Sequence, residues 1–150
     1  MKYTFLSKKF YEDYPPNQYT QMERKENRPY AHIRLDIDGV LFALPLRSNI
    51  DHPHAYFTNK RQKCGIDYSK AVVITKDAYI DNTTKVFLRP DEFNKLRGKD
   101  HRIKQQFSDY INLYKQAKVD ETIAHRDKIL KFSTLQYFEQ YIYDNSDKKE

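Results

Sequence analysis

The sequence predicts an α+β fold in which an antiparallel sheet comes first and helices follow. Up to about residue 75 the apolar residues alternate with polar ones or form short runs, which is typical of strands, whereas from Asp91 they recur with the period of a helix. The chain has 150 residues, with no internal repeat and no segment that resembles a linker. We therefore expect residues 1–150 to form a single domain whose sheet is covered on one side by the helical C-terminal half.

The first strands are predicted from short apolar segments. Residues Lys2–Leu6 form the first strand, and a long irregular connection rich in tyrosine and proline follows over residues 11–29. In Ala31–Ile37 the apolar side chains alternate with polar ones, so His32 and Arg34 should point away from the core that their own strand builds.

A hairpin follows this strand. Asp38-Gly39 is the signal of a two-residue turn, after which Val40–Leu46 returns as an almost wholly apolar strand. Pro45 cannot donate a backbone hydrogen bond, so this strand should stop or lie at a sheet edge there. Further strands are predicted at Ala55–Thr58, Ala71–Thr75 and Val86–Leu88.

The C-terminal half carries helix signals. Pro90 and Asp91 mark the first start, and Gly98 interrupts the pattern. A further helix is predicted over about Val119–Lys131, and a short apolar stripe follows the cap-like pair Ser133-Thr134. The clearest helical stripe consists of Ile103, Phe107, Tyr110, Ile111 and Tyr114.

The chain is basic and rich in aromatic residues, with a formal net charge of +6, 13 Tyr and 9 Phe. Basic side chains neutralise phosphates and aromatic rings stack on bases, so this composition suits RNA binding. Many proteins of similar size carry such an excess of basic residues without a nucleic-acid partner, so the charge alone does not show that the protein binds RNA. The single Cys64 cannot form an intramolecular disulfide, and neither a signal peptide nor an apolar run of ~20 residues is present, so we expect a cytoplasmic protein without a membrane partner.

Side chains that could act on a phosphodiester lie on and directly after the hairpin. Metal-free RNA cleavage needs a base for the 2′-hydroxyl, an acid for the leaving 5′-oxygen, and cations or donors for the phosphorane. Ser48, His32, Arg47 and His52 are close enough in sequence to converge on one phosphate, and we expect them to be catalytic, without metal or cofactor. The proton-transfer group is His32 or His52. RNA-binding contacts are expected from Tyr3, Arg28, Tyr30, Arg34, His54, Lys60, Arg61 and Lys63.

Each catalytic candidate also has an ordinary structural interpretation. His32 could be a solvent-facing strand residue, and Ser48 could be a turn or capping residue. Arg47 could form a surface ion pair with Asp36 or Asp51.

Other chemistries have weaker signals. His52 and His54 are spaced as zinc ligands can be, but no second ligand cluster accompanies them. Cys64 could be a nucleophile or an unreactive thiol, and the basic run 60–63 could be a solvated loop or a phosphate-positioning segment. The chain has only three glycines and contains no phosphate loop, no dinucleotide fingerprint and no cluster of acids for two-metal catalysis.

The hairpin at Asp38-Gly39, with its exit Pro45-Leu46-Arg47-Ser48, resembles the toxins of type III toxin–antitoxin systems, the ToxN/AbiQ superfamily, and most closely its CptN and TenpN branches. The resemblance implies a compact, twisted antiparallel sheet with flanking helices, mostly C-terminal, like the core of the Kid and MazF toxins. It also implies a sequence-preferring endoribonuclease in which Ser48 is central to activity. ToxN-like members have Thr before this serine and Lys shortly after it, where the chain has Arg47 and Asn49-Ile50.

The same resemblance implies the partners. The inhibitor would be an antitoxin RNA pseudoknot, cut from a repeated precursor and bound in a closed protein–RNA assembly in the bacterial cytoplasm. The substrate would be cellular or phage RNA, with a role in phage defence. Two other functions stay open: a non-catalytic RNA-binding module that uses the same surface, and a protein-interaction domain without nucleic acid.

Overall fold

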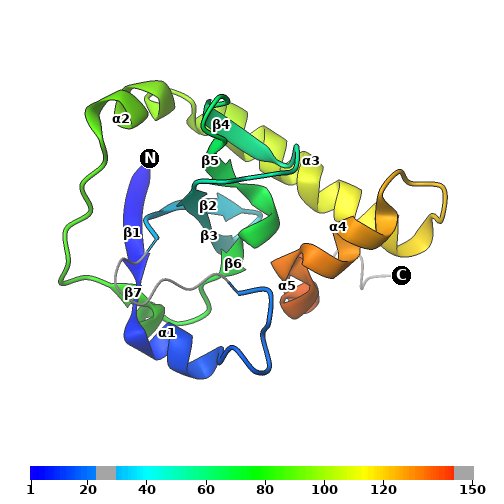
Figure 1. Cartoon of the computed structure of the whole chain (residues 1–150). Coiled ribbons are helices and arrows are strands. Elements are labelled where there is room, and N and C mark those ends of the chain that lie inside the picture. The colour runs from blue at the N-terminus through cyan, green and yellow to red at the C-terminus, as the bar shows by residue number, and fades with distance from the viewer. Residues whose placement is uncertain (23–29, 144–150) are drawn as a thin grey trace.

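The computed structural model describes residues 1–22 and 30–143. It is an α+β structure in which a seven-stranded antiparallel sheet packs against helices that lie mostly in the C-terminal half, as predicted (Figure 1). The strands are β1 (Lys2–Leu6), β2 (His32–Ile37), β3 (Val40–Arg47), β4 (Ala55–Asn59), β5 (Cys64–Asp67), β6 (Val72–Val73) and β7 (Ile80–Asp81). The α-helices are α1 (Lys8–Asp13), α2 (Pro90–Leu96), α3 (Asp100–Val119), α4 (Arg126–Phe132) and α5 (Glu139–Ile142).

The strands lie in the order β4-β5-β3-β2-β1-β7, and β6 pairs with another part of β3. The predicted strand Lys2–Leu6 and the predicted hairpin are confirmed. At the hairpin turn both Asp38 (φ 51°) and Gly39 (φ 84°) have positive φ angles, which is the geometry that matches the twist of a two-residue hairpin.

The prediction that β3 ends or lies at an edge at Pro45 is wrong, because the strand continues to Arg47 in the middle of the sheet. Leu46 donates its backbone N–H to Ala31, so the N–H that Pro45 lacks would have pointed away from β2. On that other side β3 pairs with β6 through Phe42 and Ala43, and with β5 only from Leu46 onward. Pro45 therefore lies where β3 changes partner and no donor is needed.

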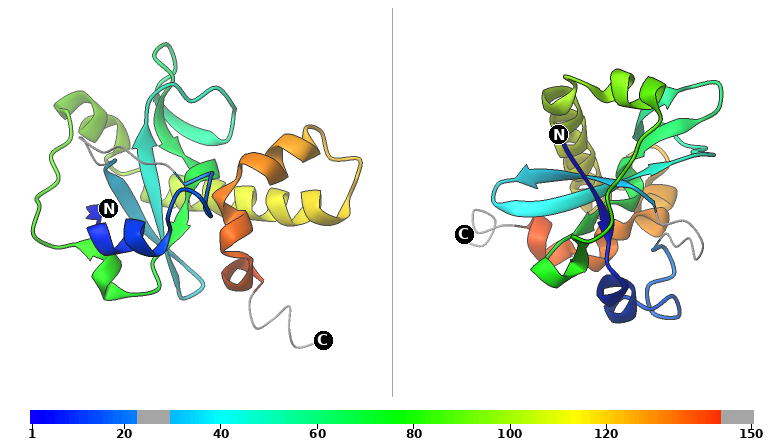
Figure 2. Two further views of the ribbon diagram at one scale, coloured as in Figure 1. Left: turned by 60° about the horizontal axis from the view of Figure 1, so that its bottom comes forward. Right: turned by 90° about the vertical axis from the view of Figure 1, so that its left-hand side faces the viewer.

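Helix α3 forms the main contact between the helical half and the sheet. All five residues of its predicted stripe are buried, and the ring of Phe107 lies 5.0 Å from that of Phe42 on β3. The predicted break at Gly98 is confirmed by its φ of 76°. Figure 2 shows α4 and α5 grouped at the C-terminal end of α3.

Several predicted elements differ in the structure. Residues 86–88 form no strand, because no neighbouring strand pairs with them in the described chain. The strand predicted over residues 71–75 is limited to β6, and α1, β5 and β7 were not predicted. The helix predicted from Val119 begins only at Arg126, because the Asp120 carboxylate accepts bonds from the backbone and hydroxyl of Thr122 and stabilises a turn instead.

The pairing of β4 with β5 brings the two backbones very close at one point. A Cβ atom on Gly65 would lie 2.1 Å from the carbonyl oxygen of Tyr56, so only glycine fits there. Among the described residues, no helix is both long enough and apolar enough to cross a membrane.

Candidate functional site

The end of β3 positions two of the predicted catalytic residues. Arg47 pairs with Gly65 on β5, and Asp67 lies two residues further along β5 on the same sheet face. The Arg47 Nη1 group donates a hydrogen bond to Oδ2 of Asp67. Ser48 follows on the exposed turn after β3. Arg47 thus pairs with a buried carboxylate. The alternative of a surface ion pair with Asp36 or Asp51 is wrong.

Asp67 is the centre of a network of hydrogen bonds. Its side chain is 0% exposed, and Oδ1 accepts bonds from the backbone N–H of Ser69 (2.9 Å), the Ser69 hydroxyl (2.6 Å) and Nε2 of His52 (3.1 Å). Burial by itself raises the pKa of this carboxyl. The bonds from His52 and Ser69 and the charge of Arg47 outweigh burial and lower the pKa below its ordinary value.

His52 is held through both of its ring nitrogens. Its Nδ1 accepts the backbone N–H of His54 at 3.0 Å, so that nitrogen carries no proton. The Ser69 hydroxyl gives its hydrogen to Asp67, so its oxygen faces the Nε2–H of His52, 3.1 Å away, as an acceptor. The hydrogen bonds therefore assign the proton of neutral His52 to Nε2 and leave neither nitrogen available to a substrate.

His54 lies beside His52 and Tyr110. Its ring lies 5.5 Å from that of His52 and 5.4 Å from that of Tyr110 on α3. Burial, and then the nearby His52 and His125, lower the pKa of His54 against the opposing effect of Asp67. Since its ordinary pKa is already near 6.5, His54 is neutral at neutral pH and able to accept a proton.

The structure overturns the expectation that His32 points away from the core, and with it the alternative of a solvent-facing strand residue. His32 is only 3% exposed, because its cross-strand neighbours Thr4 and Pro45 are also buried and β2 is covered on both faces there. Burial lowers the pKa of His32 to about 4, although a hydrogen bond from Nδ1 to the Tyr30 carbonyl opposes the shift. No contact joins His32 to Ser48, His52 or Asp67 within the described chain.

The predicted RNA-binding residues occupy different places. Lys60, Arg61 and Lys63 are exposed on the turn between β4 and β5. Tyr3 lies beside Phe93 of α2, with a ring separation of 6.4 Å, and is remote from His52 and His54 in the strand order. Arg34 is half-buried on β2.

The last two RNA-binding candidates are Tyr30 and Arg28. Tyr30 is half-buried and presents its carbonyl to His32. Arg28 lies outside the described residues.

Metal ligation was the alternative for His52 and His54. In the described ranges no three His, Cys, Asp or Glu side chains are grouped as metal ligands would be. Cys64 is half-buried, with its Sγ 3.5 Å from the carbonyl oxygen of Gln62.

The chain was also compared with known proteins. No family model, no curated protein and no solved structure matches it.

Sequence reasoning missed two residues of this site. Asp67 and Ser69 have a weak local signal, since an acid that ends an apolar strand with Ser two residues later often forms a side-chain turn.

The resulting constellation can perform acid–base chemistry on a polar substrate. It combines a neutral imidazole (His54), a guanidinium paired with a buried carboxylate (Arg47 and Asp67), and an exposed hydroxyl (Ser48). His52 supports the site by linking the loop before β4 to Asp67. We name Arg47, His52, His54, Asp67 and Ser69 the histidine–aspartate cluster.

Proposed function

We propose that the protein is a metal-independent endoribonuclease, the toxin of a type III toxin–antitoxin system. It cuts RNA to leave a 2′,3′-cyclic phosphate and a 5′-hydroxyl. Its inhibitor is a pseudoknot RNA processed from a repeated precursor, held with the toxin in a protein–RNA assembly. Its substrates are cellular or phage RNAs, so that it acts in phage defence in the bacterial cytoplasm.

The observation that supports the proposal most is the convergence on Asp67. The exit of β3, the loop before β4 and the segment after β5 each contribute one side chain to this carboxylate, namely Arg47, His52 and Ser69. A buried carboxylate held by charged and polar partners is costly to desolvate, and perturbed groups of this kind concentrate at functional sites. The cluster lies next to exposed Ser48, the residue that carries the family resemblance.

The geometry favours His54 as the general base. His32 is too buried to reach a substrate, and His52 has both nitrogens engaged. Ser48 is exposed and supplies a hydrogen-bond donor to the phosphate. Arg47 stabilises the negative charge of the phosphorane from its position beside Asp67.

The exposed basic turn between β4 and β5 offers a surface for the RNA backbone. Lys60, Arg61 and Lys63 are all exposed there, and β4 also follows directly on His54. Contacts between lysine or arginine and phosphate position RNA without selecting its sequence. The turn would therefore hold both the substrate and the inhibitory pseudoknot.

The test is incubation of the purified protein with a long adenine-rich RNA in an excess of chelator. We expect cleavage, with products that carry 2′,3′-cyclic phosphate and 5′-hydroxyl ends by mass spectrometry. A requirement for Mg²⁺ would exclude this mechanism. Salt-sensitive binding with no product over hours would instead identify a non-catalytic RNA-binding module.

A further inference from the structure

Two basic side chains lie directly opposite each other on β1 and β2, which run side by side in Figure 1. In the antiparallel register Lys2 pairs with Arg34. Residues opposite each other in such a pair point to the same face of the sheet, with their Cβ atoms roughly 5 Å apart. Like charges in this arrangement repel each other and destabilise the sheet. The pairing therefore brings two cations together at a cost to the fold.

This pair lies on the face of β1 that points away from α2. Tyr3, the next residue, packs beside Phe93 of α2, and successive side chains of a strand point to opposite faces. Lys2 is exposed on its own face. Strand β7 pairs with β1 only at Phe5 and Leu6, so no strand of the described chain covers the outer edge of β1 beside Lys2. An anion can therefore approach the pair from solvent.

The fold gives the guanidinium of Arg34 no acceptor. Its Nε is buried and has no hydrogen-bond partner among residues 1–22 and 30–143. Asp36 follows on the same face of β2, but its Oδ1 accepts the backbone N–H of Gly39 at 3.0 Å and it forms no ion pair with Arg34. A buried donor without an acceptor costs free energy, and native structures contain few of them. Arg34 is thus a cation without a structural partner.

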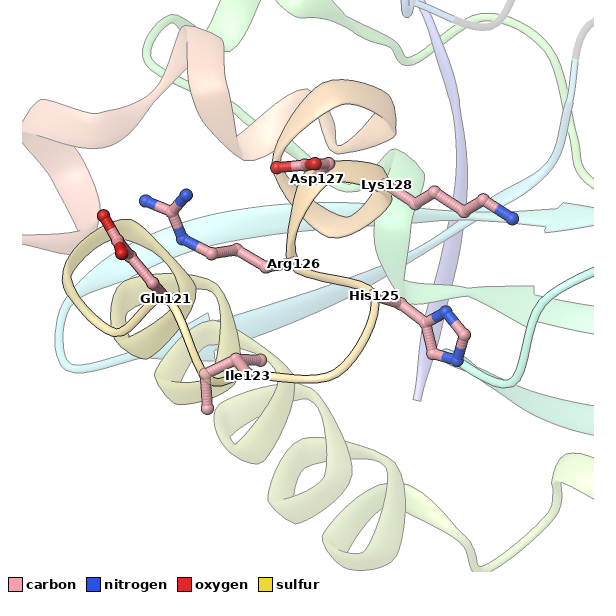
Figure 3. Close-up of a pocket in the computed structure, with 6 residues that line it drawn as sticks. All are labelled: Glu121, Ile123, His125, Arg126, Asp127 and Lys128. Carbon is pink, nitrogen blue, oxygen red and sulfur yellow. The ribbon is translucent and has the colours of Figure 1, made fainter.

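Two other arginines show the contrast. Arg47 donates to the buried carboxylate of Asp67. Arg126, at the hollow before α4 that Figure 3 shows, donates to the carbonyls of Ala117 and Lys118 at the end of α3. Both guanidiniums hold segments of the fold together, whereas that of Arg34 does not.

We propose that Lys2 and Arg34 together bind one phosphate group on this face of the sheet. The planar guanidinium donates to two oxygens of a phosphate, and a third oxygen accepts from the ammonium of Lys2. A carboxylate has only two oxygens, both of which the guanidinium would occupy, so phosphate fits the pair better. The bound anion also removes the repulsion between the two cations.

The inference goes beyond the proposed function, because neither residue belongs to the histidine–aspartate cluster or to the basic turn between β4 and β5. The phosphate comes either from the free ion or from the backbone of RNA. Contacts of this kind to an RNA backbone add affinity without selecting a sequence.

The first experiment adds inorganic phosphate and follows the Nε–H resonance of Arg34 and the backbone amides of β1 and β2 by NMR. We expect these resonances to shift to saturation. Arg34→Lys keeps the charge but loses the planar donor pair, and Lys2→Gln loses the charge, so each should weaken phosphate binding by about tenfold. Lys8→Gln, which removes an exposed cation from α1, is the control and should bind like the wild type. An Arg34 resonance that ignores phosphate, or acetate that binds as tightly as phosphate, would overturn the proposal.

Urea denaturation tests the repulsion between the two cations. Lys2 is exposed, so Lys2→Gln should fold, and without phosphate it should be at least as stable as the wild type. Phosphate should raise the midpoint of the wild type more than that of the variant, because a ligand stabilises the state that binds it. An equal rise in both proteins would place phosphate binding elsewhere and refute the site.

Binding of a single-stranded RNA at several salt concentrations distinguishes the two sources of phosphate. If the RNA backbone occupies the site, Lys2→Gln should bind RNA more weakly and lower the slope of log affinity against log salt by about 0.7, whereas Lys8→Gln should retain more of both. Unchanged RNA affinity together with weaker binding of inorganic phosphate would assign the site to the free ion. A wild type that does not cleave RNA would reject the proposed function and leave either result standing.

Discussion

His52 donates from Nε2 to Oδ1 of Asp67 across 3.1 Å, although one residue lies on the loop before β4 and the other ends β5. The same carboxylate accepts a hydrogen bond from the guanidinium of Arg47 on β3. A side chain that is 0% exposed thereby joins three separate segments, and both of its oxygens have hydrogen-bond partners.

Asp67→Asn should lower the free energy of unfolding by about 3 kcal/mol, because it removes a carboxylate charge that the mostly buried guanidinium of Arg47 pairs with. Urea denaturation measures the loss. Asp51→Asn, on the exposed part of the loop that carries His52, is the control and should change stability by less than about 0.5 kcal/mol. Equal stability of the two variants would show that the carboxylate is not the link between these segments.

Ser48→Ala should abolish RNA cleavage and leave the fold intact. The side chain is exposed and makes no hydrogen bond within the described chain, so stability should change by less than about 0.5 kcal/mol. Cleavage assays and thermal denaturation check the two parts. Ser108→Ala on α3 serves as the control and should cleave normally. Normal cleavage by Ser48→Ala would remove this serine from the proposed site.

His32 should make the protein sensitive to acid. The unfolded chain protonates His32 near its ordinary pKa of 6.5, whereas burial delays protonation in the folded state to about pH 4. The stabilising contribution is therefore complete above pH 6.5 and is lost as the pH falls towards 4, by at most about 3 kcal/mol.

Urea denaturation of His32→Phe at pH 7.5 and pH 4.5 tests this effect. The difference in stability between the two values should shrink in the variant but not vanish, because the lowered pKa of His54 acts in the same direction over this pH range. His101→Asn, which removes an exposed histidine from the start of α3, is the control and should keep the whole difference. A variant as acid-sensitive as the wild type would contradict the role of His32.

The basic turn between β4 and β5 should contribute to RNA affinity through charge. Replacing Lys60, Arg61 and Lys63 with Ser should reduce the slope of log affinity against log salt by about 2 for single-stranded RNA, since each phosphate contact contributes about 0.7. Filter binding at several salt concentrations measures the slope. The same replacements at Lys8, Lys9 and Lys76, which lie in and near α1 at the other end of the sheet, should have a smaller effect.

The parts of the fold that follow from local pattern were predictable. The hairpin needs only two residues that accept positive φ, and α3 needs only its apolar stripe. The burial of His32 was not predictable, because alternation shows which face of β2 is apolar but not whether the other face is covered as well.

The same limit applies to the candidate site. Arg47, Ser48, His52 and His54 are near one another in the chain, so they could be grouped from the sequence. Asp67 joins them through the pairing of β5 with β3, which depends on contacts distant in sequence.

Pro45 has a consequence for motion. Because β3 exchanges β6 for β5 at a residue without a backbone donor, we expect the β4–β5 ribbon to open as a unit separate from the β1–β2–β3 ladder. Measured by hydrogen–deuterium exchange, the backbone amides of β4 and β5 should exchange at one common rate, and faster than those of β2. The same exchange rate in all three strands would contradict this division. Opening of this ribbon would move His54 and the basic turn together while the rest of the domain stays folded.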